Sequence, residues 1–160
     1  HGVVRLDQRE HLESADDAEQ ERAAVRLEML AGRAPATGPR NPAQPYLVRL
    51  LQESRNPGVR AAALRGLAGI WDYEQMASML DLLDDESPRV RGAAGVAVES
   101  LLSSGRRFDA SAEPEQRRAV VTELRQMWKA FSETTLPRWQ RRLEEGDART
   151  GNTAGPIGSP

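Results

Sequence analysis

The sequence predicts an all-α fold, a short α-solenoid of about six to seven helices, and three observations lead to this prediction. A phrase at 56–64 returns at 87–95, an offset of 31 residues that is roughly the period of a two-helix repeat. Apolar residues elsewhere recur three and four positions apart, as on one face of an amphipathic helix. No stretch of the sequence alternates between polar and apolar residues with the period of two that half-buried strands require.

The first predicted helix runs from about residue 17 to residue 31 and ends at Gly32. Its apolar stripe, at helical spacing, consists of Gln20, Ala24, Leu27, Leu30 and Ala31. Residues 32–45 contain four prolines and are predicted to form a connector without regular structure. Whether the first helix stacks on the rest of the solenoid or lies apart from it stays open.

Each copy of the repeated phrase is predicted to start a helix. Asn56 and Ser87 are capping residue types, and a proline follows each of them at the first helical position, where a missing N–H costs nothing. These two helices reach to about residues 70 and 101. Shorter helices are predicted before them over 46–54 and 74–84, with a turn at 71–73.

The C-terminal part is predicted to form a loop over 105–113, a longer helix over 114–131 and a last helix from Thr135 to Gly146. The aromatic residues of the longer helix are typical of a helix that closes the end of a stack. The domain organisation expected is a loose lead-in over 1–16, one solenoid domain over 17–146 and a disordered tail over 147–160.

The composition is that of a soluble helical protein, with 39% hydrophobic and 29% charged residues and a net charge of −2. The absence of cysteine excludes disulfides, thiolate metal sites and cysteine nucleophiles. No apolar run approaches the roughly 20 residues that span a bilayer, and no signal peptide is visible. Because the chain starts at His1 and not at methionine, a removed leader or upstream domain is expected before it.

The order of acid, capping residue, proline, Val-Arg and small residues resembles that of HEAT repeats, and is closest to the short variety shared with phycobilisome-lyase-like proteins. The residues that carry the resemblance are 56–64 and 82–94, with a degenerate earlier copy at 22–25. Residues 108–110 and 114–118, leading to Trp128, are similar to a segment that often ends such arrays in large bacterial multidomain proteins. The resemblance implies a solenoid of HEAT-like hairpins.

The second copy of the phrase departs from the first at two positions. Gly95 stands where the first copy has Leu64, and Gly92 stands where it has Ala61. Two glycines inside one helix cost roughly 1 kcal/mol each relative to alanine. They indicate either a tight helix crossing or a weaker second repeat.

The resemblance also implies a role for the arginine that follows the buried valine of each copy. In such repeats Arg60 and Arg91 bond an acid near the preceding turn and form a ladder between repeats. One of the acids at 84–86 is expected to serve Arg91. The structural repeat motif predicted on this basis comprises Pro57, Val59, Arg60, Asp84, Pro88, Val90 and Arg91.

Candidates for catalysis are missing from the sequence. The two histidines, His1 and His11, lie in the expected lead-in, and there is no Gly-x-Ser-x-Gly elbow, phosphate loop or His-Glu-x-x-His motif. The acids at 84–86 lack the alternating ligands and the glycine of a calcium loop, and acids before a helix start also stabilise its dipole. We therefore expect no catalytic residue, no metal and no cofactor.

The leading functional hypothesis is a non-catalytic scaffold that binds a protein partner, is a monomer and belongs to a larger bacterial protein. The binding groove is expected along the second helices of the hairpins, with Arg65 and Arg89 as exposed contributors. Trp71 and Tyr73 lie in a turn between helices and are candidate hot-spot residues, since interfaces favour Trp, Tyr and Arg. The alternative for both aromatic residues is packing over the end of the hairpin.

Two other classes of function stay open as alternatives. The C-terminal region carries an excess of arginine, so a nucleic-acid-binding solenoid is one of them, although the bulk charge points to neither nucleic acid nor membrane. A bilin-lyase-like enzyme subunit is the other, and it requires an enclosed polar pocket. The compartment is not determined: a cytoplasmic location is favoured, and an exported mature fragment is the alternative.

Overall fold

The computed structural model describes residues 16–147, so nearly all of the expected lead-in and tail lies outside the described residues. This part of the chain contains seven α-helices, three short 3-10 helices and no strand, which confirms the all-α prediction. The α-helices are α2 (Asp17–Arg33), α3 (Gln44–Glu53), α4 (Pro57–Gly69), α5 (Met76–Asp81), α6 (Pro88–Leu102), α7 (Pro114–Glu133) and α8 (Thr135–Asp147). The 3-10 helices are η1 (Gly38–Arg40), η2 (Tyr73–Gln75) and η3 (Leu82–Asp84).

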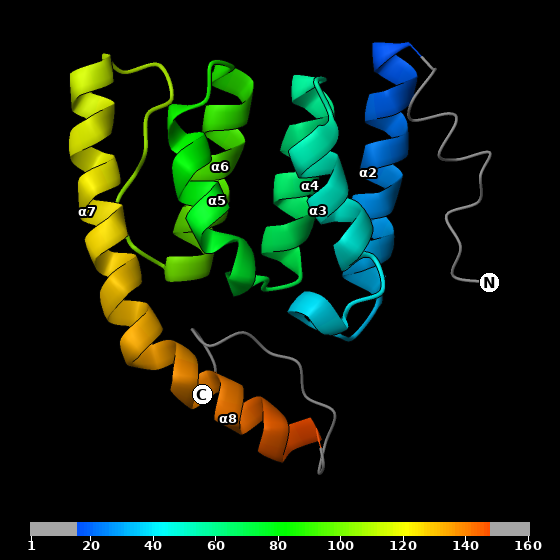
Figure 1. Ribbon diagram of the computed structural model, residues 1–160, viewed down its shortest axis with the longest axis vertical. Helices are drawn as coiled ribbons and strands as arrows, with labels where there is room; N and C mark the ends of the chain where they lie inside the picture. The colour runs from blue at the N-terminus through cyan, green and yellow to red at the C-terminus, as the bar shows by residue number, and fades with distance from the viewer. Residues whose placement is uncertain (1–15, 148–160) are drawn as a thin grey trace.

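The helices form a stack of hairpins in chain order (Figure 1). Helices α2, α4 and α6 lie side by side and run in the same direction, and α3 and α5 run in the opposite direction, packed against α4 and α6. Helix α7 follows at one end of the stack, and α8 turns away below it. Helix α2 packs directly on α4, so the first helix stacks on the solenoid.

The connector between α2 and α3 is ordered by one buried side chain. The amide of Asn41 donates to the carbonyl oxygens of Ala31 and Ala36 at 3.0 and 2.9 Å, and its Oδ1 accepts from the N–H of Ala43 at 3.0 Å. These bonds hold η1 against the end of α2. The prediction that residues 32–45 lack regular structure is therefore wrong for Gly38–Arg40.

Local capping explains where the two longer buried helices begin. The Asn56 side chain accepts from the N–H groups of Gly58 and Val59, and the Ser87 hydroxyl accepts from the N–H of Val90. Pro57 and Pro88 occupy the first helical positions. The helices that start there supply much of the core, which is made of aliphatic residues and methionine: Leu47, Val59, Leu64, Leu67, Met76, Met79, Leu80, Leu83, Val90, Val98, Leu101 and Leu124.

Aromatic residues join α8 to the end of the hairpin stack. The ring of Tyr73 stacks on those of Trp128 and Phe131, with centroids 6.2 and 5.2 Å away, and meets Trp139 edge-on at 5.4 Å. The Tyr73 hydroxyl donates to the carbonyl oxygen of Leu101 at 2.6 Å. Residues from η2, α6, α7 and α8 therefore share one cluster, as expected of a closing segment.

An extended loop over residues 104–113 replaces the returning helix of a further hairpin, and it lies against α6 (Figure 1). A Cβ added at Gly95 would lie 2.8 Å from Cδ2 of Phe108, so only glycine lets this ring pack there. The close approach at Gly95 is therefore made by a loop and not by a crossing helix. Phe108 fills the space that a leucine would take at the equivalent position.

Candidate interaction surface

The arginine of the first repeat copy connects two successive hairpins. Nη2 of Arg60, on α4, donates to Oδ1 of Asp85 at 2.7 Å. Oδ2 of Asp85 accepts from the N–H of Ser87 at 2.9 Å, at the start of α6. The two charged side chains are only 18% and 10% exposed. The acid thus belongs to the turn that follows the arginine in the chain, not to the turn before it.

The arginine of the second copy has carbonyl partners in place of an acid. Arg91 donates to the carbonyl oxygens of Asp85 and Glu86 at 2.8 and 3.3 Å, and to that of Ala110 at 3.0 and 3.1 Å. The expected pair between Arg91 and an acid at 84–86 is therefore wrong, because the guanidinium is held by main-chain carbonyl oxygens of that turn and of Ala110 in the loop. The carboxylate of Asp84 lies 3.9 Å from Nη2 of Arg117.

The predicted groove residue Arg65 bonds across to α2. Its Nε donates to both carboxylate oxygens of Glu28, at 3.2 and 3.3 Å. The Arg65 side chain is nevertheless 42% exposed. It therefore lies on the open face of the row formed by α2, α4 and α6.

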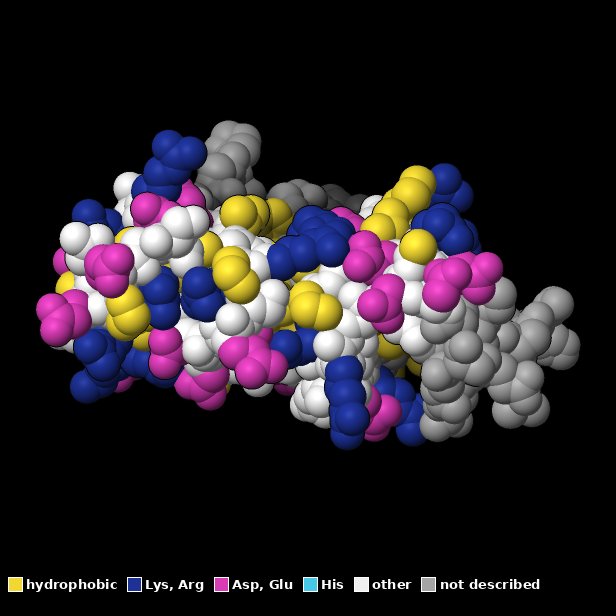
Figure 2. Space-filling view, turned by 90° about the horizontal axis from the view of Figure 1, so that it is seen from above, with side chains coloured by type: hydrophobic (Ala, Val, Ile, Leu, Met, Phe, Trp, Pro, Cys, Tyr) yellow, Lys and Arg dark blue, Asp and Glu magenta, His cyan; other side chains and the backbone are white. Residues whose placement is uncertain are grey.

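Arg89 also reaches α2, although it belongs to α6. Its Nη1 and Nη2 donate to the two oxygens of Glu21 at 3.2 and 3.1 Å. Glu21 crosses α4 at Gly58, where an added Cβ would collide with the glutamate side chain. Three helices are thus tied together at the end from which they all start, and Figure 2 views this end. Positive and negative side chains are interspersed there, with hydrophobic ones in small separate groups.

The two aromatic residues of the predicted turn differ in their surroundings. Tyr73 is buried in the aromatic cluster, so its ring packs over the end of the hairpin, which is the alternative to a hot-spot contact. Burial raises the pKa of its phenol above the ordinary value. Trp71 is half-buried against the core and has a φ of 56°, in the left-handed region. Of the two rings, that of Trp71 is the one a partner can contact.

A buried carboxyl lies next to this turn. Oδ2 of Asp72 accepts from Nε2 of Gln44 at 3.0 Å, and its Oδ1 has no hydrogen-bond partner within residues 16–147. Burial raises the pKa of Asp72 above its ordinary value, the hydrogen bond from Gln44 lowers it, and the charge of Glu74 raises it. Through Gln44 the carboxyl joins this turn to α3.

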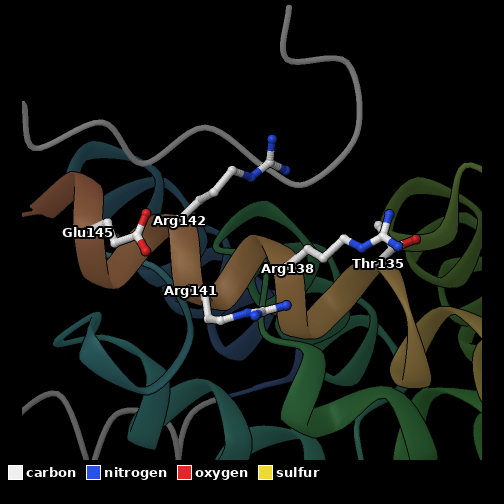
Figure 3. Close-up of a pocket in the computed structure, with 5 residues that line it drawn as sticks. All are labelled: Thr135, Arg138, Arg141, Arg142 and Glu145. Carbon is white, nitrogen blue, oxygen red and sulfur yellow. The ribbon is translucent and has the colours of Figure 1, made fainter.

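A hollow lies along α8 (Figure 3). Thr135, Arg138, Arg141, Arg142 and Glu145 line it, all from this one helix. No hydrogen bond or ion pair within the described part of the chain occupies the three guanidinium groups. The hollow is open and is not the enclosed polar pocket that a bilin-lyase-like enzyme would require.

The outer side of α2 is a surface that the sequence pattern did not predict. Val25 is 38% exposed, and Met29 and Leu30 are each 56% exposed. Arg22, Arg26 and Arg33 are exposed beside them. The residues are spaced at i, i+3, i+4, i+7, i+8 and i+11, which is one helix face. The sequence does carry one signal for this exposed surface, the apolar pair Val25 and Met29, four positions apart. The predicted buried stripe hides the surface, because it counts Leu30 as buried.

Within the described residues there is no cluster of acids or histidines that can hold a metal ion. None of the helices between residues 16 and 147 has both the length and the apolar character to cross a bilayer.

Comparison with known proteins agrees with this architecture. The family model for HEAT repeats matches residues 44–104, a span that starts with α3 and ends directly after α6. No curated protein and no solved structure matches the chain significantly. The two hairpins α3–α4 and α5–α6, at residues 44–104 of this chain, are therefore HEAT repeats.

Proposed function

We propose that the domain is a non-catalytic interaction module that binds a protein partner along the open face of α4 and α6, as part of a larger bacterial protein. HEAT repeats generally mediate contacts between proteins, which supports a binding role for residues 44–104. The observation that carries the proposal is the cross-tied row of α2, α4 and α6. Its ion pairs fix the helices before any partner arrives, and a preorganised surface loses less entropy on binding.

The exposed groups of this face suit a protein partner. Val96, on α6, is 64% exposed and offers an apolar contact. Arg65 bonds Glu28 through Nε, which leaves its terminal nitrogens for a carboxylate of the partner. Arg89 is 57% exposed while it is paired with Glu21, and it adds a positive charge to the face. Trp71 adds a half-buried ring at the end of the hairpin.

A pull-down with the full chain tests this function. The chain is used as bait at low and at moderate salt, with and without nuclease, beside the variants Arg65→Glu/Arg89→Glu and Lys129→Glu. A protein retained by the wild type and by Lys129→Glu, but lost with Arg65→Glu/Arg89→Glu, supports the proposal. Equal retention by all three chains contradicts the assignment of the face.

A second candidate function is nucleic-acid binding by the arginines of α8. The observation that favours it is the set of three guanidinium groups along the hollow, none of them in an ion pair within residues 16–147. Affinity for nucleic acid falls steeply with salt because bound counterions are released. Retention of nucleic acid that disappears with nuclease, with salt and with Arg138→Glu/Arg142→Glu would favour this function over the first.

A further inference from the structure

We infer that the outer side of α2 is a second binding surface, and that it takes an acidic amphipathic helix of a partner protein. The surface consists of Arg22, Val25, Arg26, Met29, Leu30 and Arg33, and is called the α2 outer face below. The inference rests on the proposed function only in that the partner is a protein. The inference differs from the proposed function in the binding site, which is the α2 outer face, and in the chemistry of the partner, which is acidic and helical.

The charges of α2 are divided between its two sides. Glu21 and Glu28 point toward the stack, where Arg89 and Arg65 neutralise them. The three arginines of the α2 outer face have no ion pair within the described residues. Among residues 16–147 the helix therefore presents a positive stripe without acidic partners on the side away from α4, and such a stripe attracts carboxylates.

The apolar residues of the α2 outer face give the partner its second property. Val25, Met29 and Leu30 lie between the arginines and are exposed by more than a third of their surface. Adjacent exposed apolar side chains rimmed by polar groups mark interaction sites. From residue 22 to residue 33 the face extends for roughly 16 Å, about three helical turns. A helix with apolar residues at every third and fourth position matches this length and spacing.

The contact between α2 and α4 already shows the same arrangement on the opposite side of α2. Small and apolar residues, among them Ala24, Val59 and Ala62, pack between the two helices, and Glu28 and Arg65 form an ion pair beside them. Helix α2 is the first described helix of the row, and no other described helix covers its outer side (Figure 1). A partner helix on the α2 outer face would pack beside α2 as α4 does on the opposite side. There, α2 would supply the arginines and the partner the acids, the reverse of the contact between α2 and α4.

The four methionines of the chain allow the inference to be tested in solution. Met29 lies on the α2 outer face, Met127 is exposed on α7, and Met76 and Met79 are fully buried. The full chain, labelled with ¹³C at the methionine methyl groups, is titrated with a synthetic amphipathic helical peptide that carries leucines on one side and glutamates at its edges. We expect the Met29 resonance to shift while the other three stay in place.

Matched charge variants identify the groups responsible. Arg22→Glu/Arg26→Glu should weaken peptide binding by at least about tenfold, which corresponds to 1.4 kcal/mol. Arg118→Glu/Lys129→Glu, with the same change of charge on α7, should leave the affinity within twofold. Unchanged Met76 and Met79 resonances show that both variants fold. Equal weakening by the two variants, or a shift confined to Met127, overturns the inference.

Two further outcomes determine what occupies the α2 outer face. If the Met29 resonance does not shift but the chain still retains a protein in the pull-down, the inference is overturned and the proposed function stays in place. If the resonance does not shift and no protein is retained, both are contradicted.

The acids Asp7, Glu10 and Glu13 of the same chain are another source of carboxylates. A Met29 shift caused by Asp7→Lys/Glu10→Lys without peptide assigns the face to residues 1–15 and overturns the inference of a separate partner.

Discussion

Glu21 and Arg89 form an ion pair at 3.1 Å although they are 68 positions apart and lie on helices that flank a third. The pair is possible because Gly58 stands where the glutamate crosses α4. A glycine near the start of a helix usually signals only a weak helix former. Here its missing side chain provides the passage for a charged contact between α2 and α6.

Replacement of Gly58 by alanine should abolish this pair. The added Cβ forces Glu21 into another rotamer, so the coupling between Glu21 and Arg89 should vanish. The pair is half exposed and is therefore worth less than about 1 kcal/mol. The measurement is a double-mutant cycle, Glu21→Gln with Arg89→Gln, by urea unfolding at low salt in both backgrounds. A coupling that survives in Gly58→Ala would contradict the passage of the Glu21 side chain across α4 at Gly58.

Two glycines of α4 should respond to alanine with opposite signs. A Cβ at Gly66 would lie 2.9 Å from Cδ2 of the buried Leu47, whereas a Cβ at Gly69 meets nothing within 4 Å. Overpacking at Gly66 costs about 1–3 kcal/mol, of which the helix propensity of alanine offsets about 1. Gly69→Ala should stabilise the fold by up to about 1 kcal/mol. Urea unfolding of the two variants checks the signs, and stabilisation by both would refute the close packing at Gly66.

Burial should make one of two equally short ion pairs the stronger. The pairs Arg60–Asp85 and Arg125–Asp81 both have an N to O distance of 2.7 Å, but the first is mostly buried and the second is exposed. We expect a coupling free energy of about 1.5–3 kcal/mol for the buried pair. The exposed pair should give about 0.2–1 kcal/mol. Double-mutant cycles with glutamine and asparagine measure both values, and similar couplings would show that distance and not burial decides.

Loss of the Tyr73 hydroxyl should destabilise the fold while the aromatic cluster remains. Tyr73→Phe leaves the carbonyl oxygen of Leu101 without its donor, which costs about 1–3 kcal/mol in a buried site. Tyr73→Ala also removes the stacked ring and should cost about 3–5 kcal/mol. Thermal and urea unfolding compare the two variants. Identical stability of Tyr73→Phe and the wild type would contradict a buried hydrogen bond.

Asp72 should make the stability of the domain depend on pH. Its pKa is raised in the fold, chiefly by burial, above the ordinary value of 3.8. As the pH rises from about 4, the unfolded chain releases this proton before the folded one does, so the wild type loses stability relative to Asp72→Asn. The loss ends once the folded carboxyl has also ionised. Urea unfolding of both proteins across the acidic range checks the sign, which a pH-independent difference would contradict.

The parts of the fold that the sequence predicts well depend on neighbouring residues. Asn56 and Ser87 cap N–H groups two or three positions away, so the starts of α4 and α6 follow from the order of residues alone. The offset between the two copies then gives the hairpin repeat. Helix α3 begins at Gln44, two residues earlier than predicted, because Asn41 orders the preceding turn through partners up to ten positions away.

The candidate surface is harder to predict because it depends on contacts between distant residues. The apolar stripe of the first helix is correct for Ala24 and Ala31 but wrong for Leu30, since α2 is covered on one side only. The turn sequence leaves open whether Tyr73 contacts a partner or packs over the hairpin end, and α7 and α8 decide this because they place three rings around it. Arg91 bonds no carboxylate at 84–86 but main-chain carbonyls, among them that of Ala110 in a loop that begins more than ten positions later.

The ring of Phe108 has a consequence for how such repeats are recognised. The second repeat has glycine at position 95 where the first has Leu64, and the match to HEAT repeats ends at residue 104. The missing volume arrives four residues beyond that limit, on a side chain outside the repeat. Relatives that carry leucine at the position of Gly95 should lack the bulky ring at the position of Phe108, so the two positions would vary together as one unit of packing.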